Sequence, residues 1–512
     1  MKAFKKLKLL LAFLLLFTVV ILPSCSAAKG DMMLDGGMNF APMEDAIAGN
    51  SPNADMESGD KYTEIIENSF VNTSDNATSY FSIDANTSSY PNLRSYINKG
   101  LTVYKDMVRV EEMLNYFSYD YDRPEGDDIL ALNASVFDNP YNPETKLFTI
   151  GLAAREVEFK EQKNNLVFLI DVSGSMFGSD RLGLVQQAFK MLTENLNEND
   201  RVSIVTYAGN DSVALEGASG ADKARIMAVI EDLQAGGSTA GADGINTAYA
   251  LAERYFIEGG NNRVILATDG DFNVGVSSTA GLENLIKNKR ESGVYLSVFG
   301  VGNGNYQAEK MEALALNGNG AYSFLDSVAE ARRALVTEIG GTMLTVAKDV
   351  KAGVVFNTEY VESFRLIGYE NKQMTEDEFN DAAKDAGELG SGHTVTVVYE
   401  IKLTDKEFTE DSKLADVTVR YKTTENSGGV SNEPSELVLP VSTSVYHAAM
   451  TENDTFVASV VEFALILRES KYKGNADLNA LITRLDDLDL TSDALKAEFR
   501  ELVKKYRSNI GE

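Results

Sequence analysis

The 512-residue sequence is poor in cysteine, in histidine and in basic residues. A single cysteine, Cys25, excludes an intramolecular disulfide and leaves its thiol free for another reaction. The two histidines, His393 and His447, are isolated along the chain, and an isolated histidine is more often structural than catalytic. With 47 Lys and Arg against 77 Asp and Glu, the formal net charge of −30 opposes binding to nucleic acid or to anionic lipid headgroups.

The N-terminus also lacks an apolar run long enough to cross a bilayer, which takes about twenty residues. Four lysines precede a short uncharged run from Leu9 to Leu22, which is typical of a secretory signal that is removed. The run ends in LPSC, which resembles a bacterial lipobox, and this resemblance implies cleavage before Cys25 and acylation of its thiol. We therefore expect residues 1–24 to be a lipoprotein signal peptide, and the mature chain to be lipid-anchored in a bacterial cell membrane, facing outward at the cell surface or in the periplasm.

Cleavage there would remove four lysines and no acidic residue, so the mature chain would be four charges more negative than the full sequence. Lipid, rather than basic residues, would then hold the protein at the membrane. Residues 25–60 mix Gly, Ala, Pro, Asn, Asp and Met without periodicity, which predicts a flexible tether.

Residues 61–164 and 343–445 flank the middle of the chain, and both predict β-strands. The first region contains a helical pattern in DMVRVEEMLNYF and predicted strands near 130–157. In the second, VTVVYEIKL and DVTVRY alternate apolar and polar residues, as half-buried antiparallel strands do. We expect the two regions to form one β-sandwich, with two separate units as the alternative, and residues 446–512 to form packed helices.

Residues 165–342 have a different rhythm, in which continuous apolar runs alternate with amphipathic stretches. This pattern predicts an α/β fold, namely a doubly wound parallel sheet with helices on both faces. The predicted strands are LVFLID, RVSIVTY, RVILATD, VYLSVFGV and AYSFL, and the predicted helices cover 180–197, 221–234, 242–257, 279–292, 307–317 and 327–339. Ligands of such sheets bind at the carboxyl ends of the strands.

Three loops at that edge of the sheet carry oxygen-bearing side chains. They are Asp171, Ser173 and Ser175 in DVSGSM, Ser238 and Thr239 in GGST, and Asp269 in LATDGD. Such oxygens suit a hard divalent cation, and Mg²⁺ fits best because it takes about six oxygens and usually keeps water among them. Mn²⁺ and Ca²⁺ are the alternatives, of which Ca²⁺ is less suited to a site with two carboxylates.

The segments DVSGSM, GGST and TDG together resemble the metal-ion-dependent adhesion site (MIDAS) of von Willebrand factor type A (vWA) domains, which are Rossmann-like. YFSIDANTSSYPNLRSYINKG and VRVEEMLNYFSYDY are similar to the N-terminal domain of bacterial YfbK-type lipoproteins. FRLIGYENK and DAGELGSGHTVTVVYEI resemble the region that follows the A domain in those proteins. The resemblance implies metal ligation, directly or through water, by Asp171, Ser173, Ser175, Thr239 and Asp269. Asp271 departs from the minimal motif.

The expected function is non-enzymatic adhesion or assembly of envelope complexes. Two carboxylates only balance a divalent ion, so the ion stays electrophilic and can accept a carboxylate from a protein ligand. Type A domains that serve ATPases are another possibility within the family, but an exported, lipid-anchored chain would have no ATP to use, so we expect no nucleotide. One alternative is a hydrolase that uses Ser173, Asp269 and His393, in the chain order of α/β-hydrolases. Against it, Ser173 lacks a surrounding G-x-S-x-G, and His393 lies outside the α/β region. The other alternative is a purely structural metal.

Overall fold

The computed structural model describes most of the chain after the predicted tether. The described residues are 62–159, 162–208, 210–237, 242–270, 279–304, 307–409, 411–427, 429–431 and 433–511. The predicted signal peptide, the tether and Cys25 lie outside them, as do Ser238, Thr239 and Asp271. No helix among the described residues is long and apolar enough to span a membrane.

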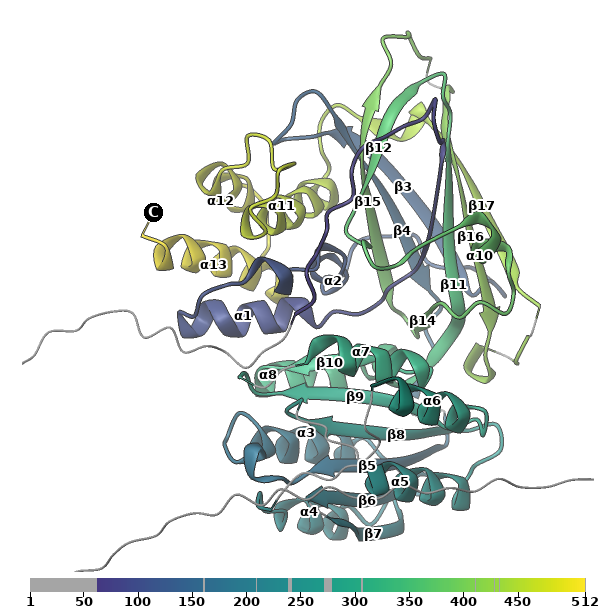
Figure 1. The fold of residues 1–512 in the computed structure, drawn as a ribbon, viewed down its shortest axis with the longest axis vertical. Coiled ribbons are helices and arrows are strands. Elements are labelled where there is room, and N and C mark those ends of the chain that lie inside the picture. Colours follow the sequence, from purple (N-terminus) through teal and green to yellow (C-terminus); the bar gives the residue numbers. More distant parts are fainter. Residues whose placement is uncertain are drawn as a thin grey trace, which may run out of the picture. The chain divides into compact units, whose positions relative to one another are not determined.

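The middle of the chain forms a six-stranded sheet in the order β10-β9-β8-β5-β6-β7 (Figure 1). Its strands are β5 (Asn164–Asp171), β6 (Arg201–Ala208), β7 (Asn210–Ser219), β8 (Asn261–Thr268), β9 (Tyr295–Val301) and β10 (Tyr322–Leu325). Every residue of the central strands β5 and β8 is buried, which explains their continuous apolar runs. The predicted doubly wound α/β fold is confirmed.

Helices cover both faces of this sheet. α3 (Leu182–Glu194), α4 (Lys223–Glu231) and α8 (Val328–Arg332) share the apolar core on one face. α5 (Ala242–Arg254), α6 (Thr279–Arg290) and α7 (Ala308–Asn317) share the core on the other. Each predicted helix of the region is present near its expected position, apart from the last one.

Two details of this region differ from the prediction. The edge strand β7 pairs antiparallel with β6, so the sheet is mixed rather than parallel throughout. Its sequence NDSVALEGAS carries no continuous apolar run, because an edge strand need bury only part of its side chains. The predicted helix 327–339 is divided into α8, a π-helical turn (Arg333–Thr337) and α9 (Ile339–Met343). Directly after the turn, the Glu338 amide donates to Arg333 O at 2.7 Å.

The flanking regions form two further sheets around one apolar core. The first sheet contains β1 (Val71–Asn72), β12 (Val361–Ile367), β15 (Thr394–Leu403), β4 (Lys146–Ala154), β3 (Leu130–Asp138) and β18 (Tyr446–His447), in that order. The second contains β13 (Gln373–Met374), β2 (Thr78–Ser82), β11 (Thr345–Phe356), β16 (Lys413–Thr423) and β17 (Ser435–Ser442), with β14 (Gly387–Gly390) paired to β11. A short helix, α10 (Glu376–Asn380), follows β13.

Strands from before and after the α/β region pair with each other in both sheets. Val397 of β15 lies opposite Ile150 of β4, and Gly353 of β11 lies opposite Tyr80 of β2. The chain therefore leaves the sandwich after β4, builds the α/β region and returns at β11. The flanks form one sandwich, as expected, and the alternative of two separate units is wrong.

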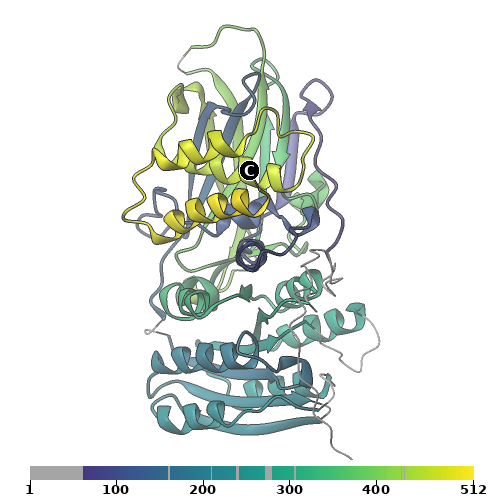
Figure 2. The ribbon, with the colours of Figure 1, turned by 90° about the vertical axis from the view of Figure 1, so that its left-hand side faces the viewer.

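Five helices cover the outer face of the sheet that contains β15 (Figure 2). They are α1 (Ser89–Lys99), α2 (Val110–Asn115), α11 (Glu452–Leu467), α12 (Leu478–Asp486) and α13 (Ala494–Asn509). Phe117, after α2, packs edge-on against Phe456 of α11 and Phe499 of α13, with ring centroids 4.9 and 5.5 Å away. Helices from the two ends of the chain thus share one core.

Candidate metal centre

The two aspartates of the predicted site lie at the carboxyl edge of the α/β sheet. Asp171 is the last residue of β5, and Asp269 directly follows β8. These two strands are parallel neighbours, so their carboxyl ends meet at the same edge. Both aspartates are buried, with 0% of the Asp171 surface and 2% of the Asp269 surface exposed. Buried carboxylates need compensating charge or hydrogen bonds, and a cation supplies the former.

The loop after β5 places two serine hydroxyls beside Asp171. The Ser173 amide donates to Asp171 Oδ1 at 2.9 Å, which folds the loop back over the strand end. The hydroxyl oxygens of Ser173 and Ser175 lie 3.0 Å apart. The structure therefore brings together three of the five predicted ligands at the end of β5 and in the loop after it, with Asp269 directly after the neighbouring strand β8.

The GGST segment reaches the same loop through its glycines. Gly236 N donates to Val172 O at 2.8 Å, and Gly174 N donates to Gly237 O at 3.2 Å. Gly237 has φ +88°, a conformation that favours glycine. Ser238 and Thr239 follow at once in the sequence but lie outside the described residues, so ligation by Thr239 stays a prediction.

Two hydroxyls that the sequence analysis did not select bind the second oxygen of Asp171. Thr268 Oγ1 and Tyr207 OH donate to Asp171 Oδ2 at 3.0 and 3.2 Å. Burial raises the pKa of Asp171, and the nearby Asp269 carboxylate raises it further, whereas hydrogen bonds from Ser173 and Thr268 lower it. Thr268 precedes Asp269 in LATDGD, and Tyr207 is the last residue of the predicted strand RVSIVTY. Their positions at strand ends were therefore the sequence signal that could have identified them.

These residues fit a hard divalent cation. Among the described residues no cluster of three or more His, Cys, Asp or Glu could hold a metal, so a metal at this edge would depend on the serine oxygens as well as the carboxylates. Two carboxylates and two hydroxyls match the oxygen preference of Mg²⁺ and disfavour metals that prefer thiolate or imidazole. Such an ion would act as a Lewis acid toward an incoming oxygen.

Arg181 is a further neighbour without a motif of its own. Its Nη1 donates to Ser175 O at 2.5 Å and lies 3.7 Å from Asp269 Oδ2, while its Nη2 donates to Asn303 O at 2.7 Å. The guanidinium thus contacts the first loop, the end of β8 and the loop after β9. Arg181 lies six residues beyond Ser175 and belongs to no motif, so the sequence did not indicate these contacts.

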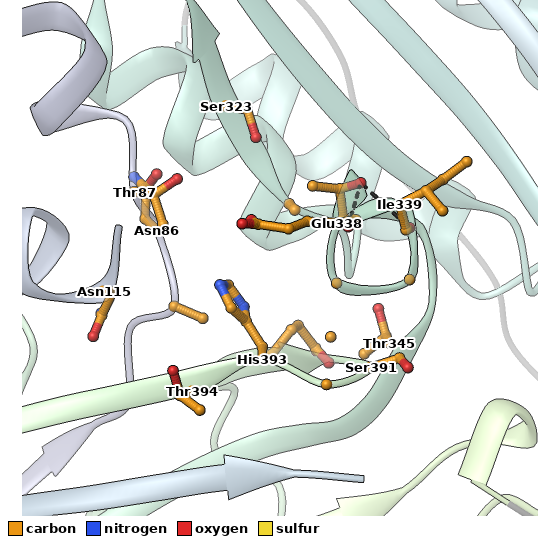
Figure 3. Close-up of a pocket in the computed structure, with 18 of the residues that line it drawn as sticks. Asn86, Thr87, Asn115, Ser323, Glu338, Ile339, Thr345, Ser391, His393 and Thr394 are labelled. Carbon is orange, nitrogen blue, oxygen red and sulfur yellow. Dashed lines mark hydrogen bonds between the residues drawn. The ribbon is translucent and has the colours of Figure 1, made fainter. Parts of the chain in front are cut away.

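His393 lies elsewhere, in a cavity of about 620 Å³ (Figure 3). Figure 3 shows its imidazole pointing into this cavity, as does the Glu338 carboxylate. Burial lowers the pKa of His393 to about 4, and the positive charges of Arg333 and Arg123 contribute. Neither Ser173 nor Asp269 lines this cavity, so the structure does not assemble the Ser-Asp-His arrangement of the hydrolase alternative.

The doubly wound sheet, with these loops at its carboxyl edge, defines the chain as a von Willebrand factor type A domain protein. Residues 165–338 match the family model "von Willebrand factor type A domain", residues 56–149 match "von Willebrand factor", and residues 341–508 match "Uncharacterized protein YfbK, C-terminal". Over 440 residues the chain is 38% identical to YfbK of Escherichia coli (strain K12), covering 81% of this chain and 75% of that one. The chain belongs to the YfbK family.

More distant similarities are confined to the fold or to part of the chain. Human inter-alpha-trypsin inhibitor heavy chain H3 is 26% identical over 191 residues, which cover 35% of this chain and 21% of that one. A solved von Willebrand factor type A protein from Catenulispora acidiphila aligns with a TM-score of 0.40 at 15% identity, covering 77% of this chain and 89% of that one. A solved structure of proximal thread matrix protein 1 from the mussel byssus, with a zinc-occupied MIDAS motif, aligns with a TM-score of 0.28 at 22% identity, covering 34% of this chain and 44% of that one.

Proposed function

We propose that this protein is a non-enzymatic envelope lipoprotein that binds a protein ligand through a divalent cation. The cation, Mg²⁺ in the first place, would be held by Asp171, Ser173, Ser175, Thr239 and Asp269. The observation that carries the proposal is the convergence of Asp171, the paired Ser173 and Ser175 hydroxyls and Asp269 at one edge of the sheet. The vWA domain matched over residues 165–338 belongs to a family whose members mediate protein interactions, and the resemblance of its loops to a MIDAS implies the metal.

The charge balance of the site explains the choice of ligand. Two carboxylates neutralise a divalent ion without making the centre negative, and hydroxyls add geometry without adding charge. An acidic side chain of another protein can then complete the coordination shell, even though the chain around the site carries a net charge of −30. A purely structural ion would instead have its shell filled by this chain alone.

Membrane attachment is the second part of the proposal. Cys25 would carry the lipid, residues 25–60 would be the tether, and the A domain would face outward from a bacterial membrane. The support is the sequence of the N-terminus, with its basic start, short apolar run and LPSC ending.

A capture experiment with the full chain in detergent tests the function. We expect envelope proteins retained in Mg²⁺ to be lost with chelator and lost with Asp171→Ala, because both remove the cation. His393→Ala is the matched control, since this side chain lies in a separate cavity. Retention that persists in chelator would contradict the proposal, and metal-independent ester or peptide hydrolysis that disappears with His393→Ala would favour the hydrolase.

A further inference from the structure

Arg181 joins three segments of the metal-bearing edge with one guanidinium. It donates to main-chain oxygens of Ser175 and Asn303, and it lies beside the Asp269 carboxylate. Its side chain is 21% exposed, so most of it is held within the protein. The backbone of Gly302 passes so close that an added Cβ would lie 2.5 Å from Arg181 Nε. The loop after β9 is therefore shaped around this side chain.

Helix α1, which belongs to the helices on the sandwich side, holds the same loop. Ser95 Oγ and Lys99 Nζ donate to Asn303 Oδ1 at 2.9 and 2.6 Å. The Asn303 side chain thus accepts hydrogen bonds from α1, while its main-chain oxygen accepts one from Arg181. This gives a continuous set of hydrogen bonds from α1 to the loop that carries Ser175.

The same helix contacts the last helical segment of the A domain. Arg94 lies 2.7 Å from Asp326, just before α8, and 2.8 Å from Glu330 within α8. These side chains are almost fully buried, with 9%, 6% and 1% of their surfaces exposed. Removing one partner of a buried ion pair is costly, so α1 is firmly attached to the A domain.

We propose that Arg181 is a positioning residue of the metal site and that helix α1 fixes it through Asn303. The N-terminal region of the chain thereby sets the metal affinity of the A domain. This inference rests on the proposed metal binding and adds to it a residue and a controlling contact. Arg181 does not ligate the ion; it holds the Ser175 loop and Asp269 in the relative position that the ion needs.

Charge and position predict opposite effects of removing Arg181. A guanidinium repels a cation, so if charge alone mattered, Arg181→Met would tighten metal binding. If position matters, the same change lets the Ser175 loop move away from Asp269 and weakens binding. Side chains that orient metal ligands typically contribute 10- to 100-fold in affinity. The direction of the change therefore separates the two explanations.

The test measures Mn²⁺ affinity of the full chain in detergent by electron paramagnetic resonance, with the metal-free melting temperature recorded for each variant. We expect Arg181→Met to weaken Mn²⁺ binding by about tenfold or more. Arg181→Lys, which keeps the charge but cannot make the forked contact, should also bind more weakly than the wild type. Lys190→Met is the control, since Lys190 lies on α3, the helix that begins directly after Arg181, and pairs with Glu231 at the surface.

A second pair of variants tests the contribution of α1. Ser95→Ala combined with Lys99→Ala should weaken Mn²⁺ binding by about threefold, a smaller effect because the contact is one step further from the ligands. Lys505→Ala is its control, because Lys505 of α13 also contacts α1 but does so through Asn98 and not through Asn303. Unchanged affinity in the double variant would overturn the role of α1.

The remaining outcomes are also decisive. Equal or tighter binding by Arg181→Met, or wild-type affinity in Arg181→Lys, would overturn the positioning role. If Arg181→Met fails to fold, as its metal-free melting temperature would reveal, Arg181→Lys decides alone. A wild-type chain that binds no Mn²⁺ would instead refute the proposed metal site itself, which distinguishes the two failures.

Discussion

Replacing Asp171 by Asn should separate metal binding from folding. The substitution preserves the shape of a side chain that has 0% of its surface exposed, and it keeps an oxygen for the Ser173 amide. The hydroxyls of Thr268 and Tyr207, which donate to Oδ2, must rotate to accept from the new amide. Each such neutral hydrogen bond contributes about 1 kcal/mol, which sets the scale of the loss.

The same substitution removes one of two neighbouring buried carboxylates. Burial and the charge of Asp269 both raise the pKa of Asp171, so the ionised pair is unfavourable without a cation. Removing this charge repulsion offsets the cost of the altered hydrogen bonds. We therefore expect the free energy of unfolding of the metal-free variant to stay within about 1 kcal/mol of the wild-type value. For an A domain of this size that corresponds to a shift in melting temperature of about 2–4 °C.

The response to Mg²⁺ should differ far more. A ligand present at 100 times its Kd stabilises the folded state by about 2.7 kcal/mol, which corresponds to roughly 5–10 °C for a domain of this size. Asp171→Asn removes one of the two carboxylates proposed as metal ligands and should lose nearly all of this increment. A neutral amide is a much poorer ligand for Mg²⁺ than a carboxylate.

The assay is thermal unfolding of wild type and variant, each in chelator and across a Mg²⁺ titration, with Lys190→Met carried through as a surface control. We expect similar melting temperatures in chelator and a Mg²⁺-dependent rise in the wild type and the control only. A rise of equal size in Asp171→Asn would refute the assignment of the site. A large loss of stability in chelator alone would show that Asp171 serves the fold rather than the metal.

Three further changes test other parts of the molecule. Cys25→Ala should leave the chain unprocessed or released from lipid, and a cleaved mature chain that still partitions with membranes would contradict the lipoprotein assignment. Thr239→Ala should keep most of the Mg²⁺ affinity measured by calorimetry yet bind its protein partner much more weakly. The resemblance to MIDAS loops predicts that this threonine contacts the metal directly only when a ligand is bound, so its loss should affect only that state. Equal loss of both would indicate a structural ion. Burial and the Glu370 carboxylate raise the pKa of Glu111 from 4.5 to about 7. Between these two pH values the folded protein holds a proton that the unfolded chain releases, so the free energy of unfolding should fall as the pH rises from 4.5 to about 7. Glu111→Gln should weaken that dependence in melts at pH 5 and pH 8, and an unchanged dependence would assign it to other groups.

The sequence predicted the α/β region well because its central strands are buried on both faces. Continuous apolar runs identify LVFLID and RVILATD as buried strands, and each segment ends in an aspartate at the carboxyl edge of the sheet. The edge strand β7 was missed because its sequence has no such run. The last helix was expected to be continuous, whereas a π-helical turn interrupts it at Arg333–Thr337, a departure that helical periodicity does not reveal.

Candidate ligands could be chosen from sequence because metal chemistry restricts residue type and strand ends restrict position. The neighbours that orient those ligands could not be chosen in this way. Tyr207, Thr268 and Arg181 act through one hydroxyl or one guanidinium each, and such groups occur throughout the chain. Only the tertiary structure showed which hydroxyl and guanidinium groups contact Asp171 and Ser175.

The sequence by itself determined the fold class, the family and the oxygen-bearing loops, because periodicity, motif and strand order are local properties of the chain. The tertiary structure alone decided what surrounds them. Pairing of β4 with β15 inserts the A domain into one sandwich, and Asn303 connects helix α1 to Arg181 beside the proposed metal site. Such contacts join residues more than one hundred positions apart, and long-range proximity depends on how whole elements pack, which no local pattern encodes.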